Sequence, residues 1–182
     1  MTCSRRCTPG TRTAGSSSAK QATVSEPPAI RFDTRRDCET QWRAVLERAR
    51  QRLDMFDPDF AVFPLGALEA DARLRAFLGG GGHLRLAMHD SGHIERHYPR
   101  FLRLLRDHGH LVECRQTPRT LRQLTDSFCI ADDVHVLRRF HSDHLRGEAD
   151  FEAPGAADLP AHRFAAIWEE SGLILTPTVT GL

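Results

Sequence analysis

Apolar side chains recur at helical spacing in several stretches of the chain. The first stretch begins after Asp33 or Thr34, residue types that cap helices, and Asp37 places a carboxylate in the first turn, where the helix dipole favours it. A single apolar stripe follows, formed by Trp42, Val45, Leu46, Ala49 and Leu53. The same analysis predicts helices over residues 69–78, from about Pro99 to Gly109, over 118–124 and over about 159–171.

Compact apolar runs between these helices predict β-strands. The runs lie near Phe60, Leu86, Val112, Cys129 and Val136. The last two flank Asp132-Asp133, a pair that suits the turn of a hairpin. Strands that alternate with helices and end in a hairpin and a closing helix are typical of an α/β fold. We therefore predict a mixed β-sheet flanked by helices on both faces.

The first 30 residues differ in composition from the rest. They are rich in Ser, Thr, Gly and Pro and show no apolar periodicity, so we predict a disordered tail over 1–30 and a single folded domain over 31–182. The tail lacks the apolar core of a secretory signal, and no apolar run reaches the roughly 18 residues of a membrane helix. These features predict a cytoplasmic protein that does not enter a membrane.

Arginine supplies nearly all of the positive charge. The chain has 24 arginines and one lysine, Lys20, which lies in the predicted tail. The domain therefore has no lysine for Schiff-base chemistry or for a P-loop phosphate site. The five cysteines are irregularly spaced and include no Cys-x-x-Cys pair, which favours a reducing compartment over a disulfide framework.

The charges are unevenly distributed, although the formal net charge is only +1. Seven arginines lie between residues 96 and 122, whereas six carboxylates and one arginine lie between 147 and 182. This asymmetry suits an anionic ligand, a partner or head-to-tail self-association, and it also suits an ordinary solvated surface. A pI near 7.8 and a single tyrosine, Tyr98, argue against nucleic acid.

Ten histidines raise the question of a metal site. His89, His93 and His97 are spaced by four residues, and a helix would place His93 and His97 on one face. The chain lacks a His-Glu-x-x-His pattern, however, and His141 and His144 form only a weaker pair. We therefore predict no metal and no cofactor, with scattered surface histidines as the simpler interpretation.

The segment Thr125-Asp-Ser-Phe-Cys-Ile-Ala-Asp132 resembles the signature of the phospholipase D superfamily, His-x-Lys-x4-Asp, set in an apolar strand. The run from Phe164 to Ser171 resembles the closing helix of such domains. The resemblance spans residues 31–182 and is to phospholipase D-like domains of proteobacteria. It implies a phospholipase D-like half domain. It places Thr125 at the family's nucleophilic histidine, Ser127 at its phosphate-binding lysine and Asp132 at its aspartate.

This correspondence implies a degenerate active site, because threonine and serine cannot replace an imidazole nucleophile and a cation at phosphorus. We predict no catalytic residue and interpret the domain as a non-catalytic binding or interaction module. Active members with a single signature pair two copies across a symmetric site, so the resemblance also implies a homodimer. Two alternatives stay open: a metal- or histidine-dependent hydrolase that uses His89, Asp90 or His141, and an arginine-mediated nucleotide or nucleic-acid binder.

The candidate ligand-binding residues lie mainly at strand ends. In α/β sheets, ligands collect at the carboxyl ends of parallel strands, where His89 and Asp90 follow one predicted strand. An anionic ligand is the partner that this arrangement predicts. The signature hairpin adds the other members of the predicted site, Asp126, Asp132, Arg138 and His141.

Overall fold

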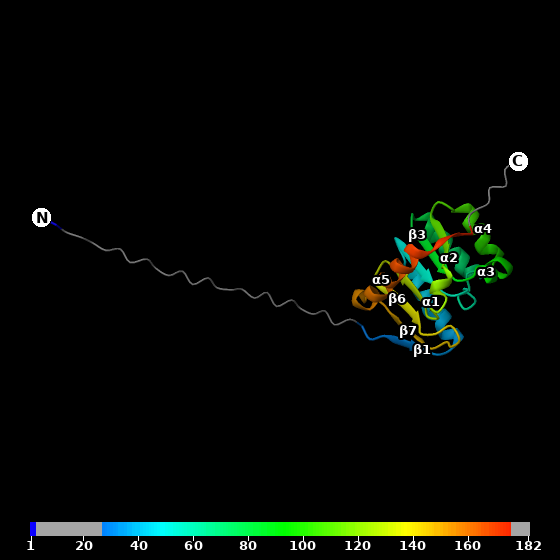
Figure 1. Cartoon of the computed structure of the whole chain (residues 1–182), viewed down its shortest axis with the longest axis horizontal. Helices are drawn as coiled ribbons and strands as arrows, with labels where there is room; N and C mark the ends of the chain where they lie inside the picture. The colour runs from blue at the N-terminus through cyan, green and yellow to red at the C-terminus, as the bar shows by residue number, and fades with distance from the viewer. Residues whose placement is uncertain (3–26, 176–182) are drawn as a thin grey trace.

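The computed structural model describes residues 1–2 and 27–175. The first strand begins at Ile30 (Figure 1), next to the boundary expected from composition. Most of the predicted disordered tail lies outside the described residues. Among the residues that are described, no helix combines the length and the apolar character needed to cross a membrane.

Eight strands in the described part of the chain form one mixed sheet, in the order β1-β7-β6-β5-β2-β3-β4-β8. They are β1 (Ile30–Phe32), β2 (Arg52–Phe56), β3 (His83–Met88), β4 (Val112–Gln116), β5 (Ser127–Ala131), β6 (His135–Arg139), β7 (Gly147–Asp150) and β8 (Gly172–Ile174). Strands β2, β3 and β4 run parallel, and the other neighbouring pairs are antiparallel. Consequently the carboxyl ends of β2, β3, β4 and β6 and the amino end of β5 meet at one edge, called here the carboxyl edge.

Helices cover both faces of this sheet (Figure 1). They are α1 (Arg35–Arg48), α2 (Leu68–Gly79), α3 (Gly92–His97), α4 (Pro99–Asp107), the 3-10 turn η1 (Arg119–Leu121) and α5 (Pro154–Glu170). Helices α1 to α4 contribute to the larger apolar cluster on one face, whereas α5 packs on the other face against Phe56, Phe128, Ile130 and Val136. The predicted mixed sheet with helices on both faces is therefore confirmed.

The first helix begins as its sequence predicts. The backbone N–H of Asp37 donates to Thr34 Oγ1 at 3.1 Å, which satisfies one of the free donors of the first turn. Trp42, Val45 and Leu46 are buried on the face that packs against the sheet. These three members of the predicted stripe thus form the buried face of α1, whereas Ala49 is the C-cap of the helix and Leu53 lies in β2.

The apolar run near Phe60, predicted to be a strand, is a turn instead. Strand β2 ends at Phe56, and Oδ1 of the next residue, Asp57, accepts the backbone N–H groups of Asp59 and Phe60 at 3.0 and 2.6 Å. Phe60 has a φ of 60°, in the left-handed region that strands exclude. Its ring is buried at 5.9 Å from that of Phe63, so this run contributes to the core from a loop.

Several other elements differ from the prediction. The short strands β1, β7 and β8 are not expected from the sequence, and β7 reads Gly-Glu-Ala-Asp, without apolar alternation. The helix predicted from about Pro99 to Gly109 is α4, but the separate helix α3 before it is not among the predicted helices. Tyr98 divides the two, because proline has no N–H to continue a helix. The helix predicted over 118–124 is only a 3-10 turn.

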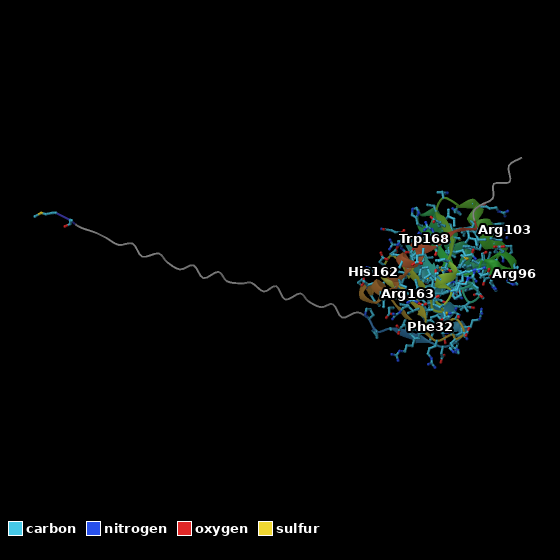
Figure 2. The ribbon with its side chains drawn as sticks, in the orientation of Figure 1. Phe32, Arg96, Arg103, His162, Arg163 and Trp168 are labelled. Atoms are coloured by element: carbon cyan, nitrogen blue, oxygen red, sulfur yellow. The ribbon has the colours of Figure 1, made fainter. Side chains whose placement is uncertain are left out.

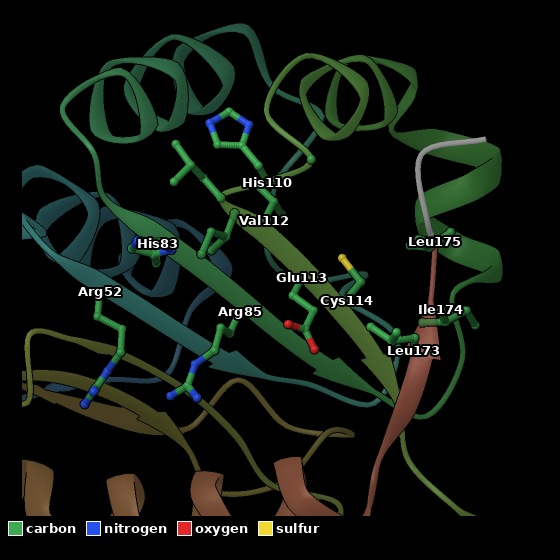
Figure 3. A pocket seen from close by; sticks show the side chains of 13 residues that line it. Arg52, His83, Arg85, His110, Val112, Glu113, Cys114, Leu173, Ile174 and Leu175 are labelled. Carbon is green, nitrogen blue, oxygen red and sulfur yellow. The ribbon is translucent and has the colours of Figure 1, made fainter. Parts of the chain in front are cut away.

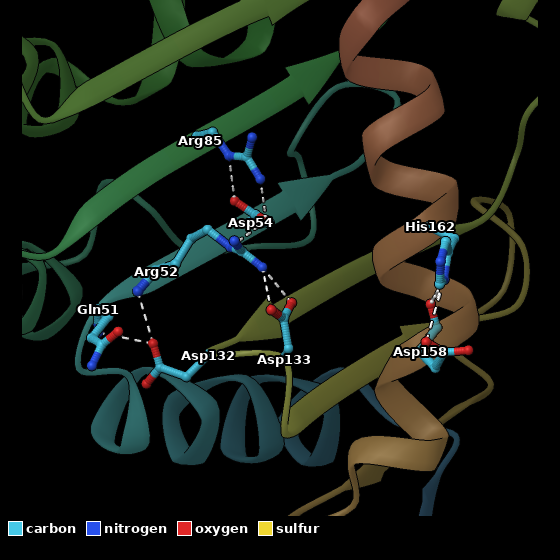
Figure 4. Close-up of polar contacts among 8 residues, drawn as sticks. All are labelled: Gln51, Arg52, Asp54, Arg85, Asp132, Asp133, Asp158 and His162. Atoms are coloured by element: carbon cyan, nitrogen blue, oxygen red, sulfur yellow. Dashed lines mark hydrogen bonds and ion pairs between the residues drawn. The ribbon is translucent and has the colours of Figure 1, made fainter.

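The turn between β5 and β6 is anchored by Asp132. Asp132 and Asp133 have φ values of 54° and 58°, in the left-handed region that tight hairpin turns require. The Asp132 carboxylate accepts the backbone N–H groups of Arg50, Gln51 and Arg52 at 2.7, 2.8 and 2.8 Å. Figure 4 shows the contacts of Gln51 and Arg52. The turn is thereby fastened to the chain that enters β2, at the end of the sheet opposite the carboxyl edge.

We expect Asp132→Ala to lower the free energy of unfolding by about 2–4 kcal/mol, because it removes the carboxylate that three backbone N–H groups share. Asp132→Asn keeps one acceptor and the tolerance of positive φ, so its effect should be smaller. Urea denaturation measures both variants. Asp133→Asn is the control, since Asp133 forms an exposed ion pair with Arg52. Equal, small losses at positions 132 and 133 would contradict the anchoring role.

Candidate functional site

A buried polar cluster occupies the carboxyl edge where β2, β5 and β6 meet. Asp57 follows β2, Ser127 begins β5 and Arg139 ends β6, with exposures of 0, 1 and 2%. The Ser127 hydroxyl donates to Asp57 Oδ2 at 2.5 Å. Arg139 Nη2 donates to the same oxygen at 2.9 Å and to Ser127 Oγ at 3.0 Å. The three side chains therefore form one closed hydrogen-bonded group.

The Asp57 carboxylate uses all of its acceptor capacity inside the protein. Oδ2 accepts from Ser127 and Arg139, while Oδ1 accepts the backbone N–H groups of Asp59 and Phe60. Burial raises the pKa of the Asp57 carboxyl, and the Arg139 guanidinium, the Ser127 hydroxyl and those two N–H groups oppose this rise. The carboxylate is thus a structural centre with no acceptor site left for a ligand.

The charged guanidinium group of Arg139 is buried inside the domain. Its Nε and Nη1 atoms are buried and have no hydrogen-bond partner among the described residues. The guanidinium lies near α1, where burial raises the pKa of the Cys38 thiol to about 11 and Arg139 opposes that rise. A guanidinium so placed does not present its charge to solvent, and Asp57 supplies the compensating charge.

His89, which follows β3, is buried and bonded through both ring nitrogens. Nε2 lies 2.8 Å from the carbonyl oxygen of Leu124, and Nδ1 lies 2.5 Å from Thr117 Oγ1. Because a carbonyl oxygen only accepts, Nε2 carries the proton and Nδ1 accepts from the threonine hydroxyl. The Phe56 ring packs edge-on at 5.5 Å. The imidazole is therefore engaged on all sides within the domain.

The other predicted site residues are spread along the edge and beyond it. Asp90 is exposed next to His89, and His141 lies in the β6–β7 loop, where Nδ1 accepts the backbone N–H of Asp143 at 3.1 Å. Asp132 lies at the opposite end of the sheet, in the β5–β6 turn. The structure therefore does not gather the six predicted residues into one group.

His89 and Arg138 do share a face of the sheet. His89 contacts Phe56, and Arg138 lies opposite Phe128 in the register, and both phenylalanines belong to the apolar cluster under α5. Strands β3 and β6 are nevertheless separated by β2 and β5, three strand spacings or about 14 Å. One small ligand does not bridge the two side chains.

Asp126 and Arg138 do line a common pocket, of about 530 Å³, between the ends of the β5–β6 hairpin and α5. Arg163 of α5 lines it too and donates to Asp126 at 2.7 Å, while Arg138 pairs with Glu148 of β7. The exposed side chain of Leu159 adds apolar surface. A pocket of this volume, with guanidinium groups and apolar walls, has the dimensions of a small-molecule site.

A second pocket, of about 460 Å³, lies over strands β2, β3 and β4 beside β8 (Figure 3). Arg85 is central to it and donates to both oxygens of Asp54, at 2.7 and 2.5 Å (Figure 4). Its guanidinium also lies over the rings of Phe164 and Trp168, at 4.9 and 5.1 Å from the centroids. These contacts use Arg85 to hold α5 on the sheet, so we assign the candidate site to the pocket at the carboxyl edge.

The sequence gives only a partial signal for the Asp57–Arg139 pair. The Asp57-Pro58 dipeptide indicates a turn. Arg139, next to Arg138, indicates a cation in the predicted hairpin. Because side chains alternate along a strand, Arg139 shares a face with the buried Leu137 and therefore requires a buried partner. The partner is 82 residues away in the chain, which no local pattern identifies.

Solved structures of the phospholipase D family share this fold. The phospholipase D family member Nuc from Salmonella typhimurium is similar with a TM-score of 0.60 at 15% identity, over 82% of this chain and 99% of that chain. NucT from Helicobacter pylori gives a TM-score of 0.54 at 10% identity, over 81% and 99%. The chain therefore has a phospholipase D-like α/β fold.

A family model described as a domain of unknown function, DUF7931, matches residues 34–175, and the chain belongs to this family. TrmBL2, an archaeal chromatin protein with a novel mode of DNA binding, is also similar, with a TM-score of 0.62 at 12% identity. That match covers 86% of this chain but only 56% of TrmBL2. At these identities the structural likeness shows the fold alone. A comparison with curated proteins finds no match.

We expect Arg139→Met to destabilise the domain by about 3–5 kcal/mol at neutral pH, because it leaves the Asp57 carboxylate buried without a counter-charge. Loss of the guanidinium raises the pKa of Asp57 further, so the folded state binds more protons than the unfolded chain. Stability should then be greatest at low pH and fall as pH rises above the ordinary carboxyl value of 3.8.

Urea denaturation across about pH 4 to 8 tests this expectation. The control is Asp57→Asn/Arg139→Met, which removes the titrating group and should lose the added pH dependence. If the stability of Arg139→Met does not change with pH in this range, the assigned pairing of Asp57 with Arg139 is wrong.

Proposed function

We propose that the domain is a non-catalytic phospholipase D-like binding module with a degenerate signature. The observation that carries this proposal is the position of Ser127, the residue that corresponds to the family's phosphate-binding lysine. Its side chain is buried and bonded to Asp57 and Arg139. A side chain that points into this closed group does not offer a cation to a phosphoryl oxygen.

The chemistry of the family mechanism supports the same conclusion. Attack at phosphorus needs an imidazole nucleophile and cations that stabilise the phosphoryl oxygens. Thr125 stands at the nucleophile position and Ser127 at the lysine position, and the chain's only lysine is Lys20. A threonine hydroxyl without an adjacent base is a poor nucleophile at neutral pH.

The alternative hydrolase, built on His89, Asp90 or His141, has less support. Both ring nitrogens of His89 already bond to protein groups, so His89 has no lone pair for a metal or a phosphorus atom. Within residues 1–2 and 27–175, no three His, Cys, Asp or Glu side chains gather in metal-ligand geometry.

The pocket beside α5 supports a small anionic ligand. Arg138 and Arg163 are partly exposed there, and a guanidinium has five N–H donors, more than one carboxylate partner can occupy. A cytoplasmic location, an assembly of two copies and the division into a tail over 1–30 and one domain over 31–182 belong to the same proposal.

We expect no hydrolysis of bis(4-nitrophenyl) phosphate above the buffer rate, and no change in Thr125→Ala. An active phosphodiesterase of the family, assayed side by side, confirms that turnover is detectable. Turnover that disappears in Thr125→Ala would overturn the degenerate signature. Turnover that survives in Thr125→Ala but is lost in His141→Ala would support the histidine-dependent alternative instead.

We expect Arg138→Gln/Arg163→Gln to weaken the binding of inorganic phosphate at least tenfold, because it removes the two partly exposed guanidinium groups that line the pocket. Isothermal titration calorimetry measures the affinity. The matched control is Arg35→Gln/Arg43→Gln, which removes the same charge from ion-paired positions on α1. Equal affinities for the two double variants would exclude this pocket as the phosphate site.

A further inference from the structure

Six of the described arginines that form no ion pair lie in one segment of the domain. Among the described residues, six arginines between residues 96 and 122 form no ion pair, and they are Arg96, Arg100, Arg103, Arg106, Arg119 and Arg122. Helix α2 gives the contrast, since Arg73 pairs with Glu47 and Arg75 pairs with Asp71. These six guanidinium groups therefore have no carboxylate within ion-pair distance, unlike Arg73 and Arg75 of α2.

The packing of α4 directs its arginines to solvent. Phe101, Leu104 and Leu105 are buried against the rest of the domain, and the opposite side carries Arg100, Arg103 and Arg106, all exposed. Six residues of helix separate Arg100 from Arg106, about 9 Å along the axis. The spacing of three residues therefore places the guanidinium groups of Arg100, Arg103 and Arg106 in a row along the helix α4.

Arg96, near the end of α3, extends this row. Figure 2 shows Arg96 and Arg103 on the same side of the domain. Asp107 closes α4 but is held by Arg75 of α2 at 2.7 Å, and Glu95 accepts the Ser91 hydroxyl at 2.5 Å. We call Arg96, Arg100, Arg103 and Arg106 the α4 arginine surface.

This surface lacks the apolar side chains that other partners need. The large exposed hydrophobic residues of the described chain are Met1, Ile30, Leu68, Phe140, Leu159 and Leu173, none of which belongs to α3 or α4. A membrane surface is held by inserted apolar groups, and a protein interface by buried aromatic or aliphatic anchors. A nucleic-acid backbone requires only positive charge and N–H donors in a fixed arrangement.

We propose that the α4 arginine surface binds the phosphate backbone of nucleic acid without reading its sequence. Guanidinium groups are suited to this role because their planar N–H forks match phosphate oxygens. The pI near 7.8 reflects the average charge of the chain, and aromatic residues serve base stacking; binding to the phosphate backbone depends on neither. The surface is separate from the pocket beside α5, so this proposal does not rest on the proposed function.

Fluorescence anisotropy with labelled DNA duplexes of two unrelated sequences tests the proposal. We expect similar micromolar affinities for both duplexes at about 50 mM salt, and a steep loss of affinity as salt rises. Arg100→Gln/Arg103→Gln/Arg106→Gln should weaken binding at least tenfold. It should also reduce the slope of log K against log salt by about 2–3, since each phosphate group that is no longer neutralised reduces the slope by about 0.9.

The matched control is Arg35→Gln/Arg43→Gln/Arg73→Gln, which removes the same three charges from ion-paired positions on α1 and α2. It should keep the wild-type affinity and slope. Thermal unfolding checks that both triple variants remain folded. Arg103→Glu, a single exposed reversal, gives the same test if the α4 triple variant does not fold.

Three results would overturn the proposal: no binding by the wild-type chain at low salt, equal losses in the two triple variants, or an unchanged salt slope in the α4 variant. Vesicles that contain phosphatidylserine provide the remaining comparison. If the α4 variant loses vesicle binding but retains DNA binding, the surface recognises lipid and the assignment to nucleic acid is wrong.

Discussion

The ion pair between Asp57 and Arg139 holds together the edge of the sheet at which ligands of α/β proteins usually bind. It joins the end of β2 to the end of β6, and through Ser127 it includes the start of β5. The same carboxylate shapes the turn that carries the Phe60 ring into the core. Neither charged group reaches solvent. If either one bound a ligand instead, its partner would remain buried without a counter-charge.

This constraint decides which groups remain for ligand binding. His89 is held between Thr117 and Leu124, and Asp132 is bound to three backbone N–H groups at the far end of the sheet. His89, at a strand end, and Asp132, in the signature segment, thus use their polar atoms in hydrogen bonds within the domain. The guanidinium groups in the pocket beside α5 and along α4 lie outside the buried cluster and still present N–H donors to solvent.

The sequence predicts the fold class and the elements with strong periodicity, but not the polar cluster. The runs at Leu86, Val112, Cys129 and Val136 are strands, because each buried run of alternating or continuous apolar residues spans the sheet core. The run at Phe60 has the same composition but forms a loop, in which Asp57 accepts the backbone N–H groups of Asp59 and Phe60. Composition cannot reveal the Asp57–Arg139 pair, since its partners are 82 residues apart. The site residues Asp126 and Arg138 do share a pocket, because hairpin ends are close by construction.

Net charge is a poor guide to what this surface can bind. The formal charge of +1 averages arginines that already pair with carboxylates, such as Arg35, Arg73 and Arg75, with the unpaired arginines of residues 96–122. Helices α4 and α5 lie on opposite faces of the sheet. The carboxylates of α5 are therefore farther from the arginine row than the Debye length of about 8 Å at physiological salt. A polyanion that approaches α4 meets the local charge, which is positive because the α2 carboxylates Glu69 and Asp71 pair with arginines of α1 and α2, and Asp107 pairs with Arg75.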